Sequence, residues 1–127
     1  MNVTPVYASI LGLLFIGLSL RTIRLRRRLR VAIGDNDNAE LRRAMRVHAN
    51  FAEYVPLTLL LVFFVEMDGV PAAWVHALCL TLLYGRLLHA WGVSQLRENF
   101  RYRVSGMVLT FASIIAAGMT IMLTRIF

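Results

Sequence analysis

The chain contains no lysine and only one cysteine, so its positive charge comes from arginine and it cannot form an internal disulfide. All 14 basic residues are arginine and outnumber seven acids, which gives a formal net charge of +7. Because Cys79 has no second cysteine to pair with, an internal disulfide is impossible, and we expect no metal cofactor. Charged residues make up only 17% of the chain and hydrophobic residues 58%, above the roughly 45–50% of soluble domains. The 127 residues therefore predict one membrane domain.

Long apolar runs define the expected architecture. Residues 3–20 and 104–124 are uncharged and, at roughly 18 and 21 residues, are long enough to cross a bilayer. Two further helical segments lie between them, separated from their neighbours by turn-rich sequence. We expect an all-α, integral membrane four-helix bundle in which residues 1–127 form a single domain. The predicted helices cover about residues 3–28, 39–66, 72–93 and 101–125.

The arginines fall between the apolar runs, so their first role is to set topology. They cluster at residues 21–46 and 97–103, whereas the middle connection carries only Glu66 and Asp68. The positive-inside rule then places the first and third connections in the cytoplasm and both termini outside it. In a bacterium this corresponds to the inner membrane, with both termini in the periplasm. On this interpretation we expect no nucleic-acid partner.

A polar stripe on the second predicted helix is the first candidate site. Arg43, Arg46, Asn50 and Glu53 are spaced i, i+3, i+7, i+10, within an arc of about 80°. A charged side chain deep in a bilayer costs ~2.5–3.5 kcal/mol, so such residues should face the bundle interior or a wet cavity. The alternative is that Glu53 only neutralises Arg46 or Arg86 in a structural pair.

Polar groups on the other helices are expected at the same depth. Arg86 and His89 are three residues apart on the third helix and share a face, although His89 alone could be an interior packing residue. Further candidates from the first and fourth helices are Arg24, Arg101, Arg103 and Ser105. Many cations, one carboxylate and one amide suit a small ligand with several carboxylates and an amine.

The segment RAMRVHANFAEY, residues 43–54, resembles the R-x-x-R-A-H-x-N-x-x-E motif of the MAPEG family, the membrane-associated proteins in eicosanoid and glutathione metabolism. The arginines after the first helix and RLLHAWG at residues 86–92 agree in order and spacing. The resemblance covers nearly the whole chain and is closest to the bacterial branch, which is similar to microsomal glutathione transferase. It implies a homotrimer that binds glutathione between neighbouring subunits near the cytoplasmic side.

The resemblance also implies roles for individual residues. By position, Arg24, Arg46, Asn50 and Glu53 match residues that bind glutathione or support its site, and Arg86 and His89 match a polar pair on the third helix. Arg103 matches the arginine that activates the thiol, with Ser105 as its hydroxyl neighbour. Arg101 and Arg103 could exchange these roles, because the register between His89 and Ser105 is open.

The implied activity is that of a membrane transferase, or a peroxidase, that uses glutathione as co-substrate. Its partners would be glutathione, a lipophilic small molecule or lipid, and the membrane lipids. The alternative is a non-enzymatic protein of the same fold that binds or scaffolds lipid or glutathione. This non-enzymatic alternative is favoured by two positions where family members carry tyrosine. The residues there are Val93 and either Met107 or Val108. A transporter with Glu53 as proton site is disfavoured, because nearby arginines keep a carboxylate ionised.

Overall fold

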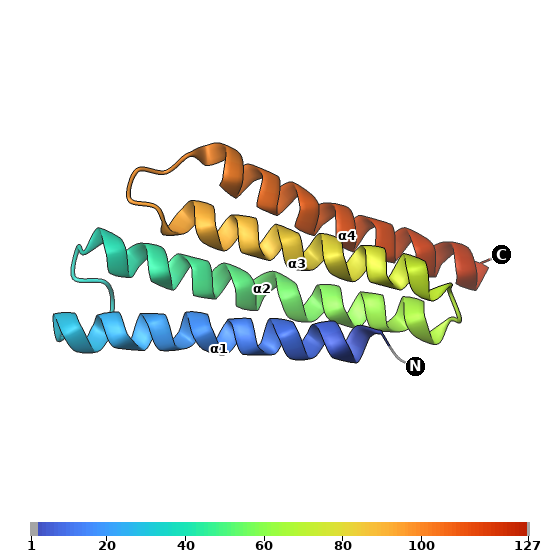
Figure 1. Cartoon of the computed structure of the whole chain (residues 1–127), viewed down its shortest axis with the longest axis horizontal. Coiled ribbons are helices and arrows are strands. Elements are labelled where there is room, and N and C mark those ends of the chain that lie inside the picture. The colour runs from blue at the N-terminus through green and yellow to red at the C-terminus, as the bar shows by residue number, and fades with distance from the viewer. Residues whose placement is uncertain (1–2, 127) are drawn as a thin grey trace.

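Four α-helices account for almost all of the described chain. The computed structural model describes residues 3–126 and contains no β-strand in that range. The helices are α1 (Thr4–Leu29), α2 (Ala39–Met67), α3 (Ala72–Ser94) and α4 (Phe100–Ile126). They lie side by side with alternating direction, so α1 begins and α4 ends at the end where α2 joins α3 (Figure 1). The predicted all-α four-helix fold is confirmed.

Local sequence signals set the helix ends next to the arginine-rich connections. α1 stops at Arg30, whose left-handed backbone (φ 55, ψ 39) ends the helical hydrogen-bond pattern. α2 starts after Asn38, whose Oδ1 accepts a hydrogen bond from the Leu41 amide at 3.0 Å. Pro56 lies inside α2 without ending it, as membrane helices tolerate.

Three helices qualify as membrane spans by length and composition alone, namely α1, α2 and α4. α3 does not, although the sequence predicts four spans. Its 23 residues are about 35 Å long, enough to cross a ~30 Å hydrocarbon layer, and it lies between α2 and α4 (Figure 1). Of its polar groups, Arg86 and His89 are buried in protein, and His76, near the start of the helix, is exposed and bonds to Tyr7. α3 therefore has the length to cross the same layer as its neighbours, with Arg86 and His89 shielded from lipid.

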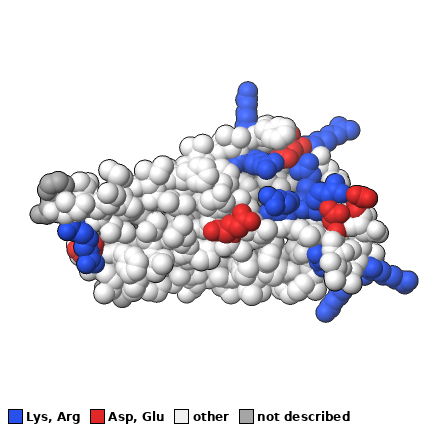
Figure 2. All heavy atoms as spheres, turned by 180° about the vertical axis from the view of Figure 1, so that it is seen from behind, with Lys and Arg blue, Asp and Glu red and all other residues white. Residues whose placement is uncertain are grey.

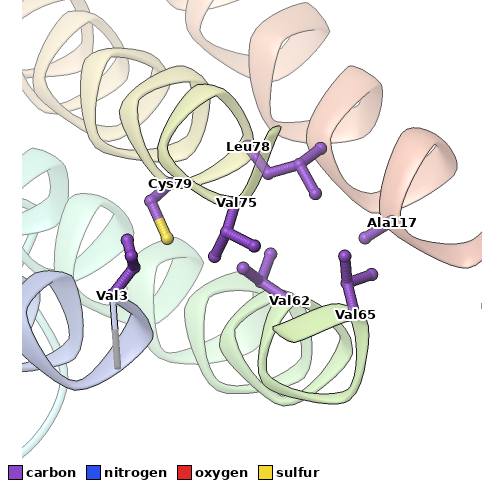
Figure 3. Packing of buried hydrophobic residues seen from close by; sticks show 7 residues of the cluster. All are labelled: Val3, Val62, Val65, Val75, Leu78, Cys79 and Ala117. Atoms are coloured by element: carbon purple, nitrogen blue, oxygen red, sulfur yellow. The ribbon is translucent and has the colours of Figure 1, made fainter. Parts of the chain in front are cut away.

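The core consists of apolar clusters spaced along the bundle. At the end where α2 joins α3, small side chains such as Val62, Val65 and Val75 form one apolar cluster that also includes Cys79 and Ala117 (Figure 3). Leu11, Phe51, Val55 and Leu82 fill the middle. α1 and α4 do not contact each other within the described residues. Both helices therefore expose long apolar faces, as expected of surfaces that meet lipid or another subunit.

α3 and α4 approach each other most closely at glycines. A Cβ atom at Gly106 would lie 2.6 Å from both the Gly85 oxygen and the His89 nitrogen, and one at Gly92 would lie 2.8 Å from the Arg103 nitrogen. Small residues permit such contact, which drives membrane helix association by close packing. The contact fixes the start of α4, with Arg103, against the end of α3.

Two acidic residues fasten the end opposite the arginine clusters. The Glu66 carboxylate accepts hydrogen bonds from the amides of Val3 and Thr4 at the start of α1. A carboxylate is favoured there because a helix N-terminus has free amides and a positive dipole end. Asp68 accepts from Arg125 Nε at 3.0 Å and so joins the α2–α3 turn to the end of α4.

Candidate functional site

Charged side chains gather at one end of the bundle. Figure 2 shows most basic groups at the end that bears the α1–α2 and α3–α4 connections. At the other end, Asp68 is paired with Arg125. The long surface between them is almost entirely uncharged (Figure 2). A polar ligand at the bundle surface would therefore bind at the arginine-rich end.

A basic pocket of about 240 Å³ opens at this end, between the start of α2, the end of α3 and the start of α4. Its lining combines four arginines with one carboxylate. The lining residues are Ala39, Arg42, Arg43, Arg46, Val93, Glu98 and Arg103. Of the predicted site residues, the structure brings Arg46 and Arg103 together here.

Glu98 organises this basic pocket. Its side chain is only 8% exposed and accepts a hydrogen bond from Arg43 at 2.8 Å, while Arg103 lies 3.6 Å from its other oxygen. Arg43 also donates to the Val93 carbonyl at 3.1 Å. The α3–α4 connection is thus held against α2. Within residues 3–126, Arg46 has no carboxylate within salt-bridge distance, so the pocket keeps an unneutralised positive charge that suits an anionic ligand.

Behind the pocket, Arg86 occupies an interior polar cage. It is 1% exposed and donates to Asn50 Oδ1 at 2.7 Å, to Thr110 Oγ1 at 2.6 Å and, more weakly, to the Gly106 carbonyl at 3.4 Å. Arg86 lies eight residues before the end of α3, about 12 Å inside the bundle. Its buried charge is solvated by neutral oxygens, and no carboxylate of the described chain pairs with it. Two of the predicted site residues, Arg86 and Asn50, are therefore in direct contact.

The cage orients Asn50. Arg86 can only donate hydrogen bonds, so the side-chain oxygen of Asn50 faces it and the amide nitrogen points the other way. Asn50 is half-buried, which leaves that nitrogen free to donate to an acceptor. The guanidinium of Arg86 also lies 5.9 Å from the centre of the Tyr54 ring, within cation–π range.

His89 lies at the same contact between α3 and α4. It is 5% exposed, and its backbone nitrogen and Cβ face Gly106. It is thus placed one turn from Arg86 on the buried side of α3, not on the wall of the basic pocket.

The other predicted site residues lie on the surface of the single chain. Arg24, Arg46, Glu53, Arg101, Arg103 and Ser105 are all exposed. Of the α2 stripe, Arg46 lines the basic pocket and so meets the expectation of a bundle interior or a wet cavity, whereas Glu53 is exposed on the outer surface. The alternative, a structural pair of Glu53 with Arg46 or Arg86, is wrong, because no arginine of the described chain lies within 4 Å of its carboxylate.

The rotation of α2 explains this outcome. Its buried residues, including Val47, Phe51 and Val55, form a face centred roughly 130° from the polar stripe at ~100° per residue. That face packs against α1 and α3, so the stripe points outward. Only Asn50 on the stripe reaches the interior, through Arg86.

Sequence reasoning missed Glu98, Thr110 and Tyr54. Glu98 could have been found, because it is the only acid in an arginine-rich connection and an isolated acid there needs a partner. Thr110 and Tyr54 meet Arg86 from two different helices. Such a meeting depends on helix packing, and no local pattern signals it.

Comparison with known proteins gives one family. The MAPEG family model matches residues 4–123 of the chain. The chain is similar to the inner membrane protein YecN of Escherichia coli strain K12, with 39% identity over 113 residues, which cover 89% of this chain and 85% of the relative. YecN of Escherichia coli O6:H1, strain CFT073, matches with the same identity and coverage.

Proposed function

Because the chain belongs to the MAPEG family, we propose that it is a glutathione-dependent membrane transferase that conjugates the glutathione thiolate to lipophilic electrophiles. The family match, the inner-membrane relatives and the apolar helices make it a multi-pass integral membrane protein. The arginine bias further supports an orientation with the arginine-rich end in the cytoplasm and both termini outside it.

The exposed stripe on α2 supports assembly into a homotrimer. Glu53 lies 14 residues into α2, about 21 Å along the helix, and is exposed in the single chain. Facing hydrocarbon at the middle of the helix, Glu53 would cost ~2.5–3.5 kcal/mol. A neighbouring subunit that covers the stripe removes this cost. The same cover would close the outward side of the basic pocket and create a site shared between two subunits.

In that site each part of glutathione would have a matching group. One of its two carboxylates would bind Arg46. The other would bind an arginine of the neighbouring subunit, for example that subunit's Arg24. Its ammonium group would bind Glu53, which has no other partner within the described chain. The outward nitrogen of Asn50, fixed by Arg86, would donate to a glutathione oxygen or to the sulfur.

The observation that carries the chemistry is the placement of Arg103. Glu98 holds its guanidinium at 3.6 Å, yet the side chain stays 46% exposed at the mouth of the basic pocket. A free thiol has a pKa near 8.5 and is mostly protonated at neutral pH. Lowering that pKa by ~2 units needs about 2.7 kcal/mol of preferential stabilisation of the thiolate. A guanidinium in a partly dry site can supply this.

The thiolate would then attack an electrophile that enters from the bilayer. With a chloronitrobenzene, a carbon–sulfur bond forms and the carbon–chlorine bond breaks. Chloride leaves with the bonding electrons, and the thiol proton has already passed to solvent. The apolar faces of α1 and α4 would let such a molecule reach the site from lipid.

The test is conjugation by purified protein with Arg103→Leu, compared with Arg97→Leu. Both residues are exposed arginines of the same end, but Arg97 does not line the pocket. We expect Arg103→Leu to lower the conjugation rate at neutral pH about 25-fold, the loss of thiolate that a ~2-unit rise in pKa causes at pH 7, and Arg97→Leu to leave it within twofold. Equal rates for wild type and Arg103→Leu would reject this role. Loss on Arg101→Leu with retention on Arg103→Leu would move the role to Arg101.

A second candidate is a carrier or scaffold that holds glutathione or a lipid without turnover. Val93 is the observation that favours it, because it stands where family members place a tyrosine and its buried side chain offers no hydroxyl. A carrier would gain thermal stability with glutathione but consume no thiol when an electrophile is added. A transferase would show both effects.

A further inference from the structure

A second hollow lies at the arginine-rich end, apart from the basic pocket. It has a volume of about 380 Å³ and is formed by the last turns of α1 and the segment that follows. The lining residues are Ile23, Arg26, Arg27, Arg30, Val31 and Ala32. None of them lines the basic pocket, so this lipid-side hollow needs an explanation of its own.

The arginines of the lipid-side hollow have different tasks. Arg26 donates to the carbonyl oxygens of Ala32 and Gly34 at 3.2 and 3.0 Å, and these bonds fold the segment back against α1. The positive charge of Arg26, in the last turn of α1, also offsets the partial negative charge at the helix C-terminus. Arg27 and Arg30 are exposed at the rim. The end of α1 can therefore accept an anion, although a bare helix end would repel one.

The nearby acids are all engaged elsewhere. Asp35 and Asp37 pair with Arg42, and Glu40 pairs with Arg28 at 2.6 Å. Within the described residues, neither Arg27 nor Arg30 has a carboxylate within 4 Å. The rim of the hollow therefore carries two charges that no acid of the described chain neutralises.

The depth of the hollow fixes the kind of anion. About 20 helical residues cross a hydrocarbon layer of ~30 Å, so a layer that starts at the first turn of α1 ends near Ile23. Arg27 and Arg30 then lie at the level of the lipid headgroups. Ile23 is 43% and Ile33 91% exposed, which places apolar surface on both sides of these charges. A lipid offers a phosphate to the arginines and acyl chains to the isoleucines, which a soluble anion cannot do.

We propose that the hollow between Arg27 and Arg30 binds the phosphate of an anionic phospholipid, with the glycerol against Val31 and the acyl chains along Ile23. Arginine suits this ligand because its planar fork can donate two hydrogen bonds to one phosphate. The site does not depend on the proposed transferase activity, since it shares no lining residue with the basic pocket.

Native mass spectrometry of the full-length protein in mild detergent tests this site, with dioleoyl phosphatidylglycerol and dioleoyl phosphatidylcholine as probes. Wild type should bind the anionic lipid more tightly. The double change Arg27→Gln and Arg30→Gln should weaken phosphatidylglycerol binding about thirtyfold and leave phosphatidylcholine binding unchanged. The matched control is Arg28→Gln with Arg97→Gln, which removes the same charge from the same end and should stay within threefold of wild type.

Equal losses in the two double variants would show unspecific attraction and overturn the proposal. A lack of preference for phosphatidylglycerol in wild type would also overturn it, as would displacement of the lipid by millimolar inorganic phosphate. Arg27→Lys with Arg30→Lys keeps the charge but loses the planar fork, so its binding should lie between that of wild type and that of the double glutamine variant. If these lysines bind as weakly as the glutamines, attraction between the charges is not what holds the lipid.

Discussion

Gly106→Ala tests whether the contact between α3 and α4 sets the geometry of the candidate site. The added Cβ would lie 2.6 Å from both the Gly85 oxygen and the His89 nitrogen, whereas ordinary contacts begin at 3.4 Å. The helices must therefore separate by about 0.8 Å. A gap of this size forfeits roughly a quarter to a half of the dispersion energy of the contacts around it. We expect a loss of about 1–3 kcal/mol in the free energy of unfolding, the usual cost of overpacking.

The assay is unfolding of the purified protein by sodium dodecyl sulfate in mixed micelles, followed by circular dichroism. Gly118→Ala is the matched control, because Gly118 lies on the same helix, α4, and a Cβ atom added there would have no neighbour within 4 Å. Both changes gain up to about 1 kcal/mol of helix propensity, so the difference between them isolates the clash. The separation should also weaken glutathione binding, because Arg86 donates to both Gly106 and Thr110. Equal stability of the two variants would refute the close contact and the cage geometry built on it.

Two further predictions concern the opposite end of the bundle. The hydrogen bond from Arg125 lowers the pKa of Asp68 below its ordinary value of 3.8. The stability that this pair contributes is therefore present above pH 3.8 and lost as the pH falls through the lower folded pKa. The free energy of unfolding of Asp68→Asn should differ from that of wild type at pH 7, and the two values should converge in strong acid. A difference that persists in strong acid would contradict this linkage. Glu66→Gln keeps one acceptor for the α1 amides but removes the charge, so we expect a loss of about 1–2 kcal/mol on unfolding in sodium dodecyl sulfate. Glu40→Gln, at the other end, should lose less than about 0.5 kcal/mol, and equal effects would argue against the Glu66 cap.

The four helices could be predicted from the sequence, because each is marked by an apolar run or by an end signal such as Asn38. Membrane insertion and the clustering of charge at one end also follow from local composition. The direction in which each polar side chain points does not. It depends on how far α2 is rotated, which the burial of Val47 and Phe51 decides together with α1 and α3.

The candidate site was therefore only partly predictable. Spacing placed Arg46, Asn50 and Glu53 on one face of α2, but it could not show that the face points outward in a single chain. Spacing also paired Arg86 with His89, while the actual contact of Arg86 with Asn50 and Thr110 requires three helices in register. That register depends on the close contact of Gly85 with Gly106, whose importance is not visible in either segment alone.

The most direct test of the proposed function is a titration of glutathione into the detergent-purified protein at neutral pH, monitored by thiolate absorbance in the ultraviolet. We predict a saturable thiolate signal that Arg103→Leu abolishes and Arg97→Leu preserves. Binding without thiolate would contradict thiol activation and favour the carrier. An absence of binding would contradict the glutathione site as a whole.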